Sequence, residues 1–320
     1  MSAPVPAVPF ELVVDDLRHE ADDVVVVSLV DEAGQELPPW EAGAHVDLNL
    51  PGGLVRQYSL CGDPDDRHGY EVAVLRDPAS RGGSAWIHDE LAKGDRIGVS
   101  APRNNFELVD AEDYLFVAGG IGVTPFLPMT AAARAAGRPY ALVYAGRTRT
   151  GMAFVERLSE DGAVRIHVSD EGGRADLAEV LDGVGGRTAV YGCGPDRLLD
   201  ALSGLCAERG LSRQLHVEHF SGTVVDLDPD RETGFEVELA RSGEVVRVPA
   251  DRTVLEVLLD HGVPMTSSCA EGVCGSCETS VLSGEIDHRD QVLDEDDREE
   301  GAVMMICCSR ARSPRIVLDL

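Results

Sequence analysis

The chain has few aromatic residues, few basic residues and no long apolar run. Aromatic side chains make up 5% of its 320 residues, and 28 Lys and Arg residues face 57 Asp and Glu residues, so that the formal net charge is −29. An acidic surface repels nucleic acid and anionic membranes, and neither is expected as a partner. No apolar run approaches the ~18–20 residues needed to span a membrane. Residues 1–16 lack the basic and apolar regions of a secretory signal. We therefore expect a cytoplasmic protein, and we expect a monomer.

Cysteine is also sparse until the end of the chain. Five of the eight cysteines lie in the last 52 residues: Cys269, Cys274, Cys277, Cys307 and Cys308. In a reducing compartment, such clustering indicates metal ligation rather than disulfide bonds.

The length and the strand and helix patterns divide the chain into parts. A length of 320 residues with 43% hydrophobic content suits a folded protein of two or three domains. Residues 1–108 carry short apolar runs separated by turn residues, which predicts a β-barrel or a sandwich. Residues 109–226 alternate apolar strands with helical segments, which predicts a parallel sheet with helices on both faces. Residues 227–233 are mostly polar and include a proline, and they are predicted to be a linker.

The last part, residues 234–320, begins with a predicted β-hairpin that turns at residues 241–244. A helix follows, because Thr253 and Glu256 have the spacing of a capping box and Gly262 supplies a stop. The cysteine cluster comes directly after this helix.

The cysteine spacing predicts an iron–sulfur site. Cys269, Cys274 and Cys277 follow the pattern C-x4-C-x2-C, which is the plant-type ferredoxin ligand run with a distant fourth cysteine. Cys307 and Cys308 are both candidates for that fourth position. The rival interpretation is a structural zinc site, although four-cysteine zinc sites more often show two C-x2-C pairs.

Residues 267–293 and 304–320 resemble the ferredoxin domain of the phthalate dioxygenase reductase family, which includes the oxidoreductase components of vanillate O-demethylases. The resemblance implies an α+β, β-grasp ferredoxin-like fold for residues 234–320 and a 2Fe-2S cluster. It implies Cys307 as the fourth ligand, because the family's ligand precedes one residue and then Ser-Arg. Cys308 stands where the family usually has an apolar residue, so its role stays open.

The resemblance extends to a flavin site in residues 1–108, and it implies an antiparallel β-barrel there. The tetrapeptide RQYS is similar to the family's R-x-Y-S signature, in which the arginine meets the flavin phosphate and the tyrosine and serine meet the ring. A glycine pair followed by serine at a helix start adds backbone N–H groups for the phosphate. The family binds FMN, with FAD as the alternative here, and Phe220 matches an aromatic residue near the flavin, although core packing would also explain it. The expected flavin residues are Arg56, Gln57, Tyr58, Ser59, Gly82, Gly83, Ser84 and Phe220.

Residues 109–226 carry two segments that match the family's nicotinamide site. Glycines that follow a strand and open a helix allow close approach of the backbone to a pyrophosphate. In the family, the threonine of G-G-I-G-x-T-P and the cysteine of the second segment lie by the nicotinamide, and we expect Thr124 and Cys193 to be the catalytic residues. The expected nucleotide-binding residues are Gly119, Gly120, Ile121, Gly122, Thr124, Pro125, Cys193, Gly194, Pro195 and Arg147. The family mostly uses NADH, but an arginine near the adenosine ribose leaves NADPH as an alternative.

Together these modules imply a reductase that passes electrons from NADH through FMN and a 2Fe-2S cluster to a separate terminal oxygenase. The acceptor that the family implies is a Rieske-type dioxygenase or O-demethylase, and a haem-thiolate monooxygenase is the alternative. Two other interpretations remain open. One is a flavin oxidoreductase that acts on a small acceptor, and the other is a zinc-stabilised binding protein without enzymatic activity.

Overall fold

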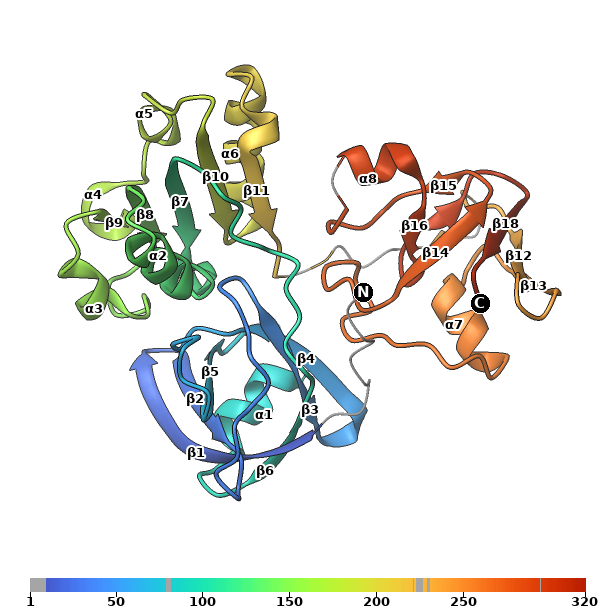
Figure 1. The fold of residues 1–320 in the computed structure, drawn as a ribbon, viewed down its shortest axis with the longest axis horizontal. Coiled ribbons are helices and arrows are strands. Elements are labelled where there is room, and N and C mark those ends of the chain that lie inside the picture. Colours follow the sequence, from blue (N-terminus) through green and yellow to red (C-terminus); the bar gives the residue numbers. More distant parts are fainter. Residues whose placement is uncertain (1–9, 79–81, 221, 223–226, 229–230, 294) are drawn as a thin grey trace. The chain divides into compact units, whose positions relative to one another are not determined.

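A computed structural model describes the chain except for residues 1–9, 79–81, 221, 223–226, 229–230 and 294, so that part of the predicted linker lies outside the described residues. The chain divides into two compact units, Met1–Phe220 and Ser221–Leu320 (Figure 1). Each unit is described by itself below. Among the described residues, no helix combines the length and the hydropathy that crossing a bilayer requires.

The first unit begins with an antiparallel six-stranded sheet in the order β4-β3-β6-β1-β2-β5. Its strands are β1 (Phe10–Ala21), β2 (Val24–Val30), β3 (His45–Leu50), β4 (Leu54–Ser59), β5 (Gly69–Leu75) and β6 (Arg96–Val99). The 3-10 turn η1 (Pro51–Gly53) joins β3 to β4, and helix α1 (Gly83–Asp89) follows β5. Leu60, just after β4, forms a bridge with Val72 of β5, which closes the sheet into the predicted barrel.

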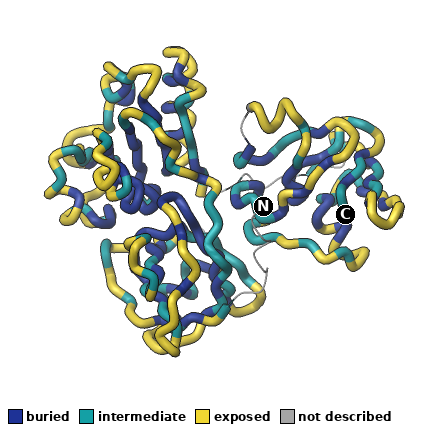
Figure 2. The backbone as a smooth tube through the Cα atoms, viewed as in Figure 1, coloured by how far each residue is buried: buried dark blue, intermediate teal, exposed yellow. Residues whose placement is uncertain are grey.

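Strand β2 shows why this part of the chain contains an unbroken apolar run. Val25 and Val27 face the barrel core, whereas Val24 and Val26 belong to a second core that they share with the next sheet. Because successive side chains alternate between the two faces of a strand, a strand buried on both faces must be apolar throughout. Figure 2 shows this strand region in the colour of buried residues.

The rest of the first unit is a five-stranded parallel sheet in the order β11-β10-β7-β8-β9. Its strands are β7 (Asp113–Gly119), β8 (Tyr140–Gly146), β9 (Val164–Val168), β10 (Thr188–Cys193) and β11 (Leu215–Glu218). The connections hold η2 (Gly120–Val123), α2 (Phe126–Ala135), α3 (Val155–Ser159), α4 (Ser169–Gly172), α5 (Leu177–Val180), α6 (Asp196–Glu208) and η3 (Ser212–Gln214). The strand order reverses between β7 and β10, and ligands of such sheets bind at this point, outside the carboxyl ends of the strands.

Helices cover both faces of this sheet, as predicted. On β7, Phe116 packs with α2 on one face, whereas Leu115 and Val117 pack with α5 and α6 on the other. The sequence pattern of residues 151–160 also predicts a helix, but the structure forms only the shorter α3 there. Phe154 has a left-handed φ of 60°, so α3 starts only after it.

The barrel and the parallel sheet are also joined by polar contacts within the first unit. The backbone N–H of Asp22 donates to the carbonyl of Thr150 at 2.9 Å, and the N–H of Phe154 donates to the carboxylate of Glu20 at 3.1 Å. These bonds hold the end of β1 against the loop that follows β8.

The second unit is a mixed five-stranded sheet in the order β13-β12-β18-β14-β16. Its strands are β12 (Phe235–Leu239), β13 (Glu244–Val248), β14 (Glu278–Ser283), β16 (Val303–Met305) and β18 (Arg315–Leu318), and a second small sheet pairs β15 (Ile286–Asp287) with β17 (Arg310–Ala311). Helix α7 (Val254–Asp260) packs its apolar side into the core of this unit, and α8 (Glu295–Glu300) is the acidic segment. The predicted fold class is therefore confirmed: an antiparallel β-barrel, an α/β parallel-sheet domain and an α+β, β-grasp domain.

The predicted capping box at the start of α7 is confirmed and allows a stability test. The Thr253 hydroxyl accepts from the Glu256 N–H at 3.1 Å, and the Glu256 carboxylate accepts from the Thr253 N–H at 2.9 Å. We expect Thr253→Ala to lower the free energy of unfolding of the second unit by about 1 kcal/mol, because one helix N–H loses its acceptor. Chemical denaturation followed by far-ultraviolet circular dichroism measures this change. Thr253→Ser keeps the hydroxyl and should stay close to wild type; equal losses in both variants would contradict the capping explanation.

Candidate functional site

The two glycine-containing segments of the parallel sheet are in direct backbone contact. A Cβ added at Gly122 would lie 2.4 Å from the carbonyl oxygen of Cys193, and one added at Gly119 would lie 2.7 Å from Cδ of Pro195. Likewise, a Cβ at Gly194 would lie 2.9 Å from Cα of Gly119. No side chain fits in these spaces, so glycine is required for the loops after β7 and β10 to meet.

The structure places the predicted nucleotide residues in this contact region. Thr124 is buried at the end of η2, where its hydroxyl donates to the carbonyl of Ile121 at 3.0 Å. Gly120 has a φ of 55°, a conformation that glycine adopts without strain. Pro125 directly precedes α2 and Pro195 directly precedes α6, so both segments open a helix. The surroundings therefore fit a pyrophosphate that approaches the backbone closely.

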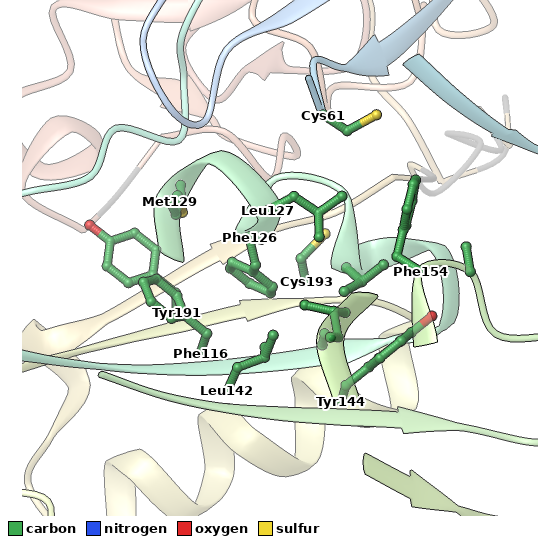
Figure 3. Close-up of a cluster of buried hydrophobic side chains, with 14 of the residues drawn as sticks. Cys61, Phe116, Phe126, Leu127, Met129, Leu142, Tyr144, Phe154, Tyr191 and Cys193 are labelled. Atoms are coloured by element: carbon green, nitrogen blue, oxygen red, sulfur yellow. The ribbon is translucent and has the colours of Figure 1, made fainter. Parts of the chain in front are cut away.

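Cys193 meets a buried carboxyl group that the sequence analysis did not select. The sulfur of Cys193, at the end of β10, lies 3.8 Å from Oε2 of Glu218 on the neighbouring strand β11. Burial, followed by the nearby Glu218 carboxyl, raises the pKa of the Cys193 thiol. Figure 3 shows Cys193 beside Phe126 and Leu127 in the shared core, with Cys61 of the barrel close to that core.

Glu218 connects this group to the barrel. Burial raises the pKa of Glu218 to about 8, while hydrogen bonds with Cys193 and Ser59 act in the opposite direction. Ser59 ends β4 and is itself buried. One residue from the expected flavin motif, one from the expected nicotinamide motif and one unpredicted acid thus meet at one place. The signal for Glu218 was a carboxylate in the apolar strand LHVEHF, and a single sequence does not reveal that it is buried.

The flavin residues predicted in the barrel lie on β4 and at the start of α1. A Cβ at Gly83 would lie 2.7 Å from Cγ of Arg56, so this side chain lies directly against the first turn of α1. The Arg56 guanidinium also donates to its neighbour Val55's carbonyl at 2.8 Å. Gly82 has a φ of 97° and precedes the helix. A cation packed beside helix N–H groups suits a phosphate, so the surroundings fit FMN.

The other flavin candidates differ in their surroundings. Gln57 and Tyr58 are half-buried on β4, and burial raises the pKa of Tyr58. The Ser84 hydroxyl accepts from the N–H of Asp77 at 3.1 Å. Phe220 is 42% exposed, so core packing does not explain it.

Arg147 lies at the carboxyl end of β8, but its charge is not isolated. Its Nε atom is 3.9 Å from the carboxylate of Asp170 on α4. Arg149 makes a two-pronged ion pair with Glu171, with nitrogen–oxygen distances of 3.1 and 2.7 Å. Two carboxylates therefore face the two arginines at this edge of the site.

Four cysteines of the second unit come together although they are distant in sequence. Cys274, Cys277 and Cys307 are buried, and Cys269 is half-buried. Hydrogen bonds with neighbouring thiols, first with Cys274 and then with Cys307, lower the pKa of Cys269. Cys307 also bonds to Cys277, so the four sulfurs are connected pairwise. Within the described residues, no three His, Cys, Asp or Glu side chains are placed to hold one single metal ion, so the arrangement does not match a mononuclear site. A binuclear iron–sulfur cluster takes four thiolates over two irons.

The backbone of the cysteine loop is turned so that an N–H group donates to one of these sulfurs. Ala270, Gly272 and Gly275 all have positive φ. The N–H of Glu271 donates to the sulfur of Cys269 at 3.3 Å. N–H donors stabilise thiolates, so the donor set fits the 2Fe-2S cluster.

Cys308 lies beside the predicted fourth ligand. Its thiol donates to the carbonyl of Met305 at 3.6 Å, and it also contacts Cys307. A Cβ at Gly272 would lie 2.6 Å from the Cys308 sulfur, so Cys308 fills the space under the cysteine loop.

A cavity of about 500 Å³ lies elsewhere in the first unit. It is lined by residues at the amino-terminal ends of β7 and β10, among them Glu112, Arg187 and Thr188. The glycine loops are at the carboxyl ends of the same strands, so this cavity is separate from the nucleotide site.

Comparisons with known proteins agree with this geometry. The model of the 2Fe-2S iron-sulfur cluster binding domain matches residues 237–312. Phthalate dioxygenase reductase of Burkholderia cepacia is 42% identical over 94% of both chains. The crystal structure of phthalate dioxygenase reductase, described as a modular structure for electron transfer from pyridine nucleotides to [2Fe-2S], has a TM-score of 0.71 at 40% identity and covers 98% of both chains.

A second kind of relative is a longer protein in which one segment is similar to this chain. The structure of an intact type IV self-sufficient cytochrome P450 monooxygenase matches with a TM-score of 0.92 at 49% identity over 98% of this chain. The chain spans 41% of the length of that protein.

The buried Glu218 carboxyl predicts a specific pH dependence. The pKa of Glu218 in the folded protein is about 8, whereas an ordinary Glu side chain has a pKa of about 4.3. At a pH between these two values, Glu218 is ionised in the unfolded state and protonated in the folded state. The free energy of unfolding of the first unit should therefore fall as pH rises, by at most about 1.4 kcal/mol per pH unit. Glu218→Gln removes this slope. Denaturation at pH 5 to 8, followed by the fluorescence of Trp40 and Trp86, measures it.

The control for this experiment is Glu208→Gln, which changes an exposed residue of α6. It should keep the wild-type slope. An unchanged slope in Glu218→Gln would show that the carboxyl is already ionised in the folded protein.

Proposed function

The chain belongs to the phthalate dioxygenase reductase family, and from this membership we propose that it is the reductase component of an oxygenase system. It is a flavin and iron–sulfur oxidoreductase that takes electrons from a reduced nicotinamide nucleotide and passes them through FMN and a 2Fe-2S cluster to a separate oxygenase. The observation that carries this proposal is the pairwise convergence of four cysteine thiols in a chain that also contains a flavin-type barrel and a nucleotide-type sheet.

We assign the sites according to the predicted modules, with residues 1–108 for FMN, 109–226 for the nucleotide and 234–320 for the cluster. Cys269, Cys274, Cys277 and Cys307 are the proposed iron ligands. When bound, FMN accepts electrons as a pair from the nicotinamide and the cluster carries them one at a time. We further propose that the protein acts as a monomer in the cytoplasm.

The protein's own groups position these cofactors. Arg56 supplies the positive charge for the FMN phosphate beside the start of α1. Gly122 lets the loop after β7 meet the loop after β10 at the proposed nucleotide site, and Thr124 is buried at the end of the same turn. Cys193 and Glu218 both hold their protons at neutral pH, because burial raises both pKa values. The ends of β10 and β11 therefore carry no charge from these two buried groups beside the proposed nicotinamide site.

We propose that NADH is preferred over NADPH. The 2′-phosphate of NADPH needs an unpaired cation, and an acid near the end of a neighbouring strand instead suits a free ribose hydroxyl. Arg149 is already engaged by Glu171, and Asp170 faces Arg147. The net charge of this group of four residues is zero, which disfavours an added dianion.

The acceptor has two candidates. Relatives with similarity over almost the whole chain are a phthalate dioxygenase reductase and a vanillate O-demethylase oxidoreductase, which supports a Rieske-type partner as the main proposal. The higher identity to the self-sufficient cytochrome P450 structure, 49% against 40%, supports a haem-thiolate monooxygenase as the second candidate.

The nucleotide preference can be tested by releasing the arginine. Glu171→Gln leaves Arg149 without its carboxylate, so we expect the ratio of kcat/KM for NADH to that for NADPH to fall about tenfold, the value of one charge-assisted hydrogen bond. Binding of AMP and of 2′-phospho-AMP, measured by calorimetry, gives the same comparison without turnover. Asp182→Asn removes an exposed partner of Arg209 and serves as control. If Glu171→Gln leaves the NADH to NADPH ratio of kcat/KM unchanged, the ion pair of Arg149 with Glu171 does not set the nucleotide preference.

The function itself is tested on the full-length protein purified without oxygen. We expect iron, sulfide and FMN in the preparation, bleaching of the flavin by NADH, and a reduced-cluster signal in electron paramagnetic resonance. Cys307→Ser should lose that signal and keep flavin bleaching, whereas Cys308→Ser should keep both. Addition of a Rieske oxygenase component or of a haem-thiolate monooxygenase then identifies the acceptor class from the reduction of its own metal centre.

Three outcomes would contradict the proposal. A colourless protein that holds zinc would support the binding-protein interpretation. Full activity towards the physiological acceptor after deletion of residues 227–320 would support a flavin enzyme with a small acceptor. Retention of the cluster in Cys307→Ser and its loss in Cys308→Ser would move the fourth ligand by one position.

A further inference from the structure

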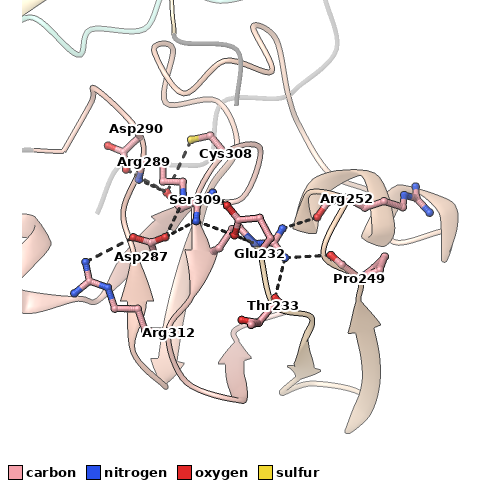
Figure 4. A network of polar contacts seen from close by, with 11 residues as sticks. Glu232, Thr233, Pro249, Arg252, Asp287, Arg289, Asp290, Cys308, Ser309 and Arg312 are labelled. Carbon is pink, nitrogen blue, oxygen red and sulfur yellow. Dashed lines mark hydrogen bonds and ion pairs between the residues drawn. The ribbon is translucent and has the colours of Figure 1, made fainter. Parts of the chain in front are cut away.

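A carboxylate outside the proposed ligand set lies at the centre of an ion-pair network in the second unit. Both oxygens of Glu232 accept from Arg289, at 2.7 and 3.0 Å, and Oε2 lies 3.1 Å from Nε of Arg310. The Glu232 side chain is 16% exposed. Arg289, followed by Arg310, holds the pKa of Glu232 below its usual range, so the group is ionised. Figure 4 shows these residues and their contacts.

Arg310 is a buried cation that depends on this carboxylate. It is 2% exposed, and its remaining N–H groups donate to the carbonyls of Arg252, Thr233 and Pro249 at 2.8 to 3.1 Å. The guanidinium also lies over the ring of Phe235 at 5.1 Å. Carbonyls satisfy its hydrogen bonds, but they do not neutralise its charge. A buried charge is tolerated only when it is paired, and Glu232 makes the ion pair with Arg310.

The same network reaches the segment that carries the fourth cysteine. Arg310 is the third residue after Cys307. It begins strand β17, which pairs with β15 in the short two-stranded sheet. Between them, the Ser309 hydroxyl accepts from the N–H of Arg289 at 3.2 Å. Glu232 is thus bound to two arginines. Arg310 belongs to the segment that follows Cys307, and Arg289 contacts that segment through the Ser309 hydroxyl.

Through Arg289 the network also reaches the loop that carries the other three cysteines. The residue after Arg289 is Asp290, which is buried, and a Cβ at Gly272 would lie 3.1 Å from its Cα. The next residue, Gln291, donates its N–H to the carbonyl of Gly272 at 2.9 Å. Gly272 lies between Cys269 and Cys274, so residues 289–291 support the cysteine loop directly.

We propose that Glu232 is a positioning residue for the iron–sulfur cluster, which holds the two parts of its ligand set in register by binding Arg289 and Arg310 together. This inference rests on the proposed function, because it requires the cluster. Groups behind the ligands orient them, and changing such groups typically costs 10–100-fold in metal affinity or activity. Glu232 lies in the segment predicted to be a linker, so the sequence alone gives no reason to connect it with the cluster.

The test compares Glu232→Gln with Glu236→Gln in the full-length holoprotein. The amide introduced by Glu232→Gln keeps the shape and one acceptor but not the charge. Arg310 therefore loses its ion pair, Arg289 keeps its ion pair with Asp287, and one carboxylate no longer joins the two arginines. We expect cluster loss to a chelator at least about tenfold faster than in wild type, altered g values of the reduced cluster, and a shifted reduction potential. The rate of flavin reduction by NADH should stay unchanged, because it does not involve the second unit.

Glu236 is a matched control because it also accepts from an arginine, Arg315, at 3.0 and 2.6 Å, but on an exposed face of β12. Glu236→Gln should match wild type in every measurement. If Glu232→Gln does not fold, Arg289→Lys decides, because lysine keeps the charge and loses the two-pronged contact. Wild-type g values, potential and cluster retention in the folded variant would overturn the proposal, even if its melting temperature fell. A wild-type protein without a cluster would instead reject the proposed function.

Discussion

The close approach of two backbone segments is the constraint on which the first unit depends. The loop after β7 can meet the loop after β10 only because Gly119, Gly122 and Gly194 have no side chains. This contact brings the end of β10, with Cys193, beside the opening of α2. Strand β11 pairs with β10 in parallel, with Glu218 opposite Cys193, so that Glu218 reaches the same place. A side chain at any of the three glycines would separate the two halves of the proposed nucleotide site, whatever residues remained there.

The second unit solves a different problem, because its cysteine ligands are far apart in sequence. Three of the cysteines lie in one loop, in which Ala270, Gly272 and Gly275 have positive φ angles. The fourth cysteine lies near the end of the chain. Hydrophobic packing places both segments in one core, but it is not directional. The ion pairs of Glu232 with Arg289 and Arg310 add direction, because a two-pronged arginine–carboxylate contact fixes angles as well as distances.

The division into strand-rich and strand–helix parts was predictable because period and spacing are local signals, whereas the antiparallel barrel and the β-grasp fold were implied by the family resemblance. The apolar runs of the barrel, the alternation of strands and helices, and the capping box at Thr253 can all be read in short windows of sequence. The bounds of α3 were less accessible, since they depend on the left-handed conformation of Phe154. For the sites, motif spacing predicted a shared site for Cys269, Cys274, Cys277 and one distant cysteine, and the family resemblance selected Cys307. Glu218 and Glu232 were missed because burial and the identity of a distant partner arise only from the folded chain.

These two carboxylates show how one side chain type takes opposite roles in the same protein. Glu218 is buried beside a thiol and a hydroxyl, neither of which carries a compensating positive charge, so desolvation dominates and the group keeps its proton. Glu232 is partly buried beside two guanidinium groups, so the charged form dominates. In a chain with a net charge of −29, an added buried negative charge is costly unless cations are placed against it. The protein therefore keeps the carboxyl near the proposed nicotinamide site neutral, and it places two arginines beside the carboxylate that we propose positions the cluster.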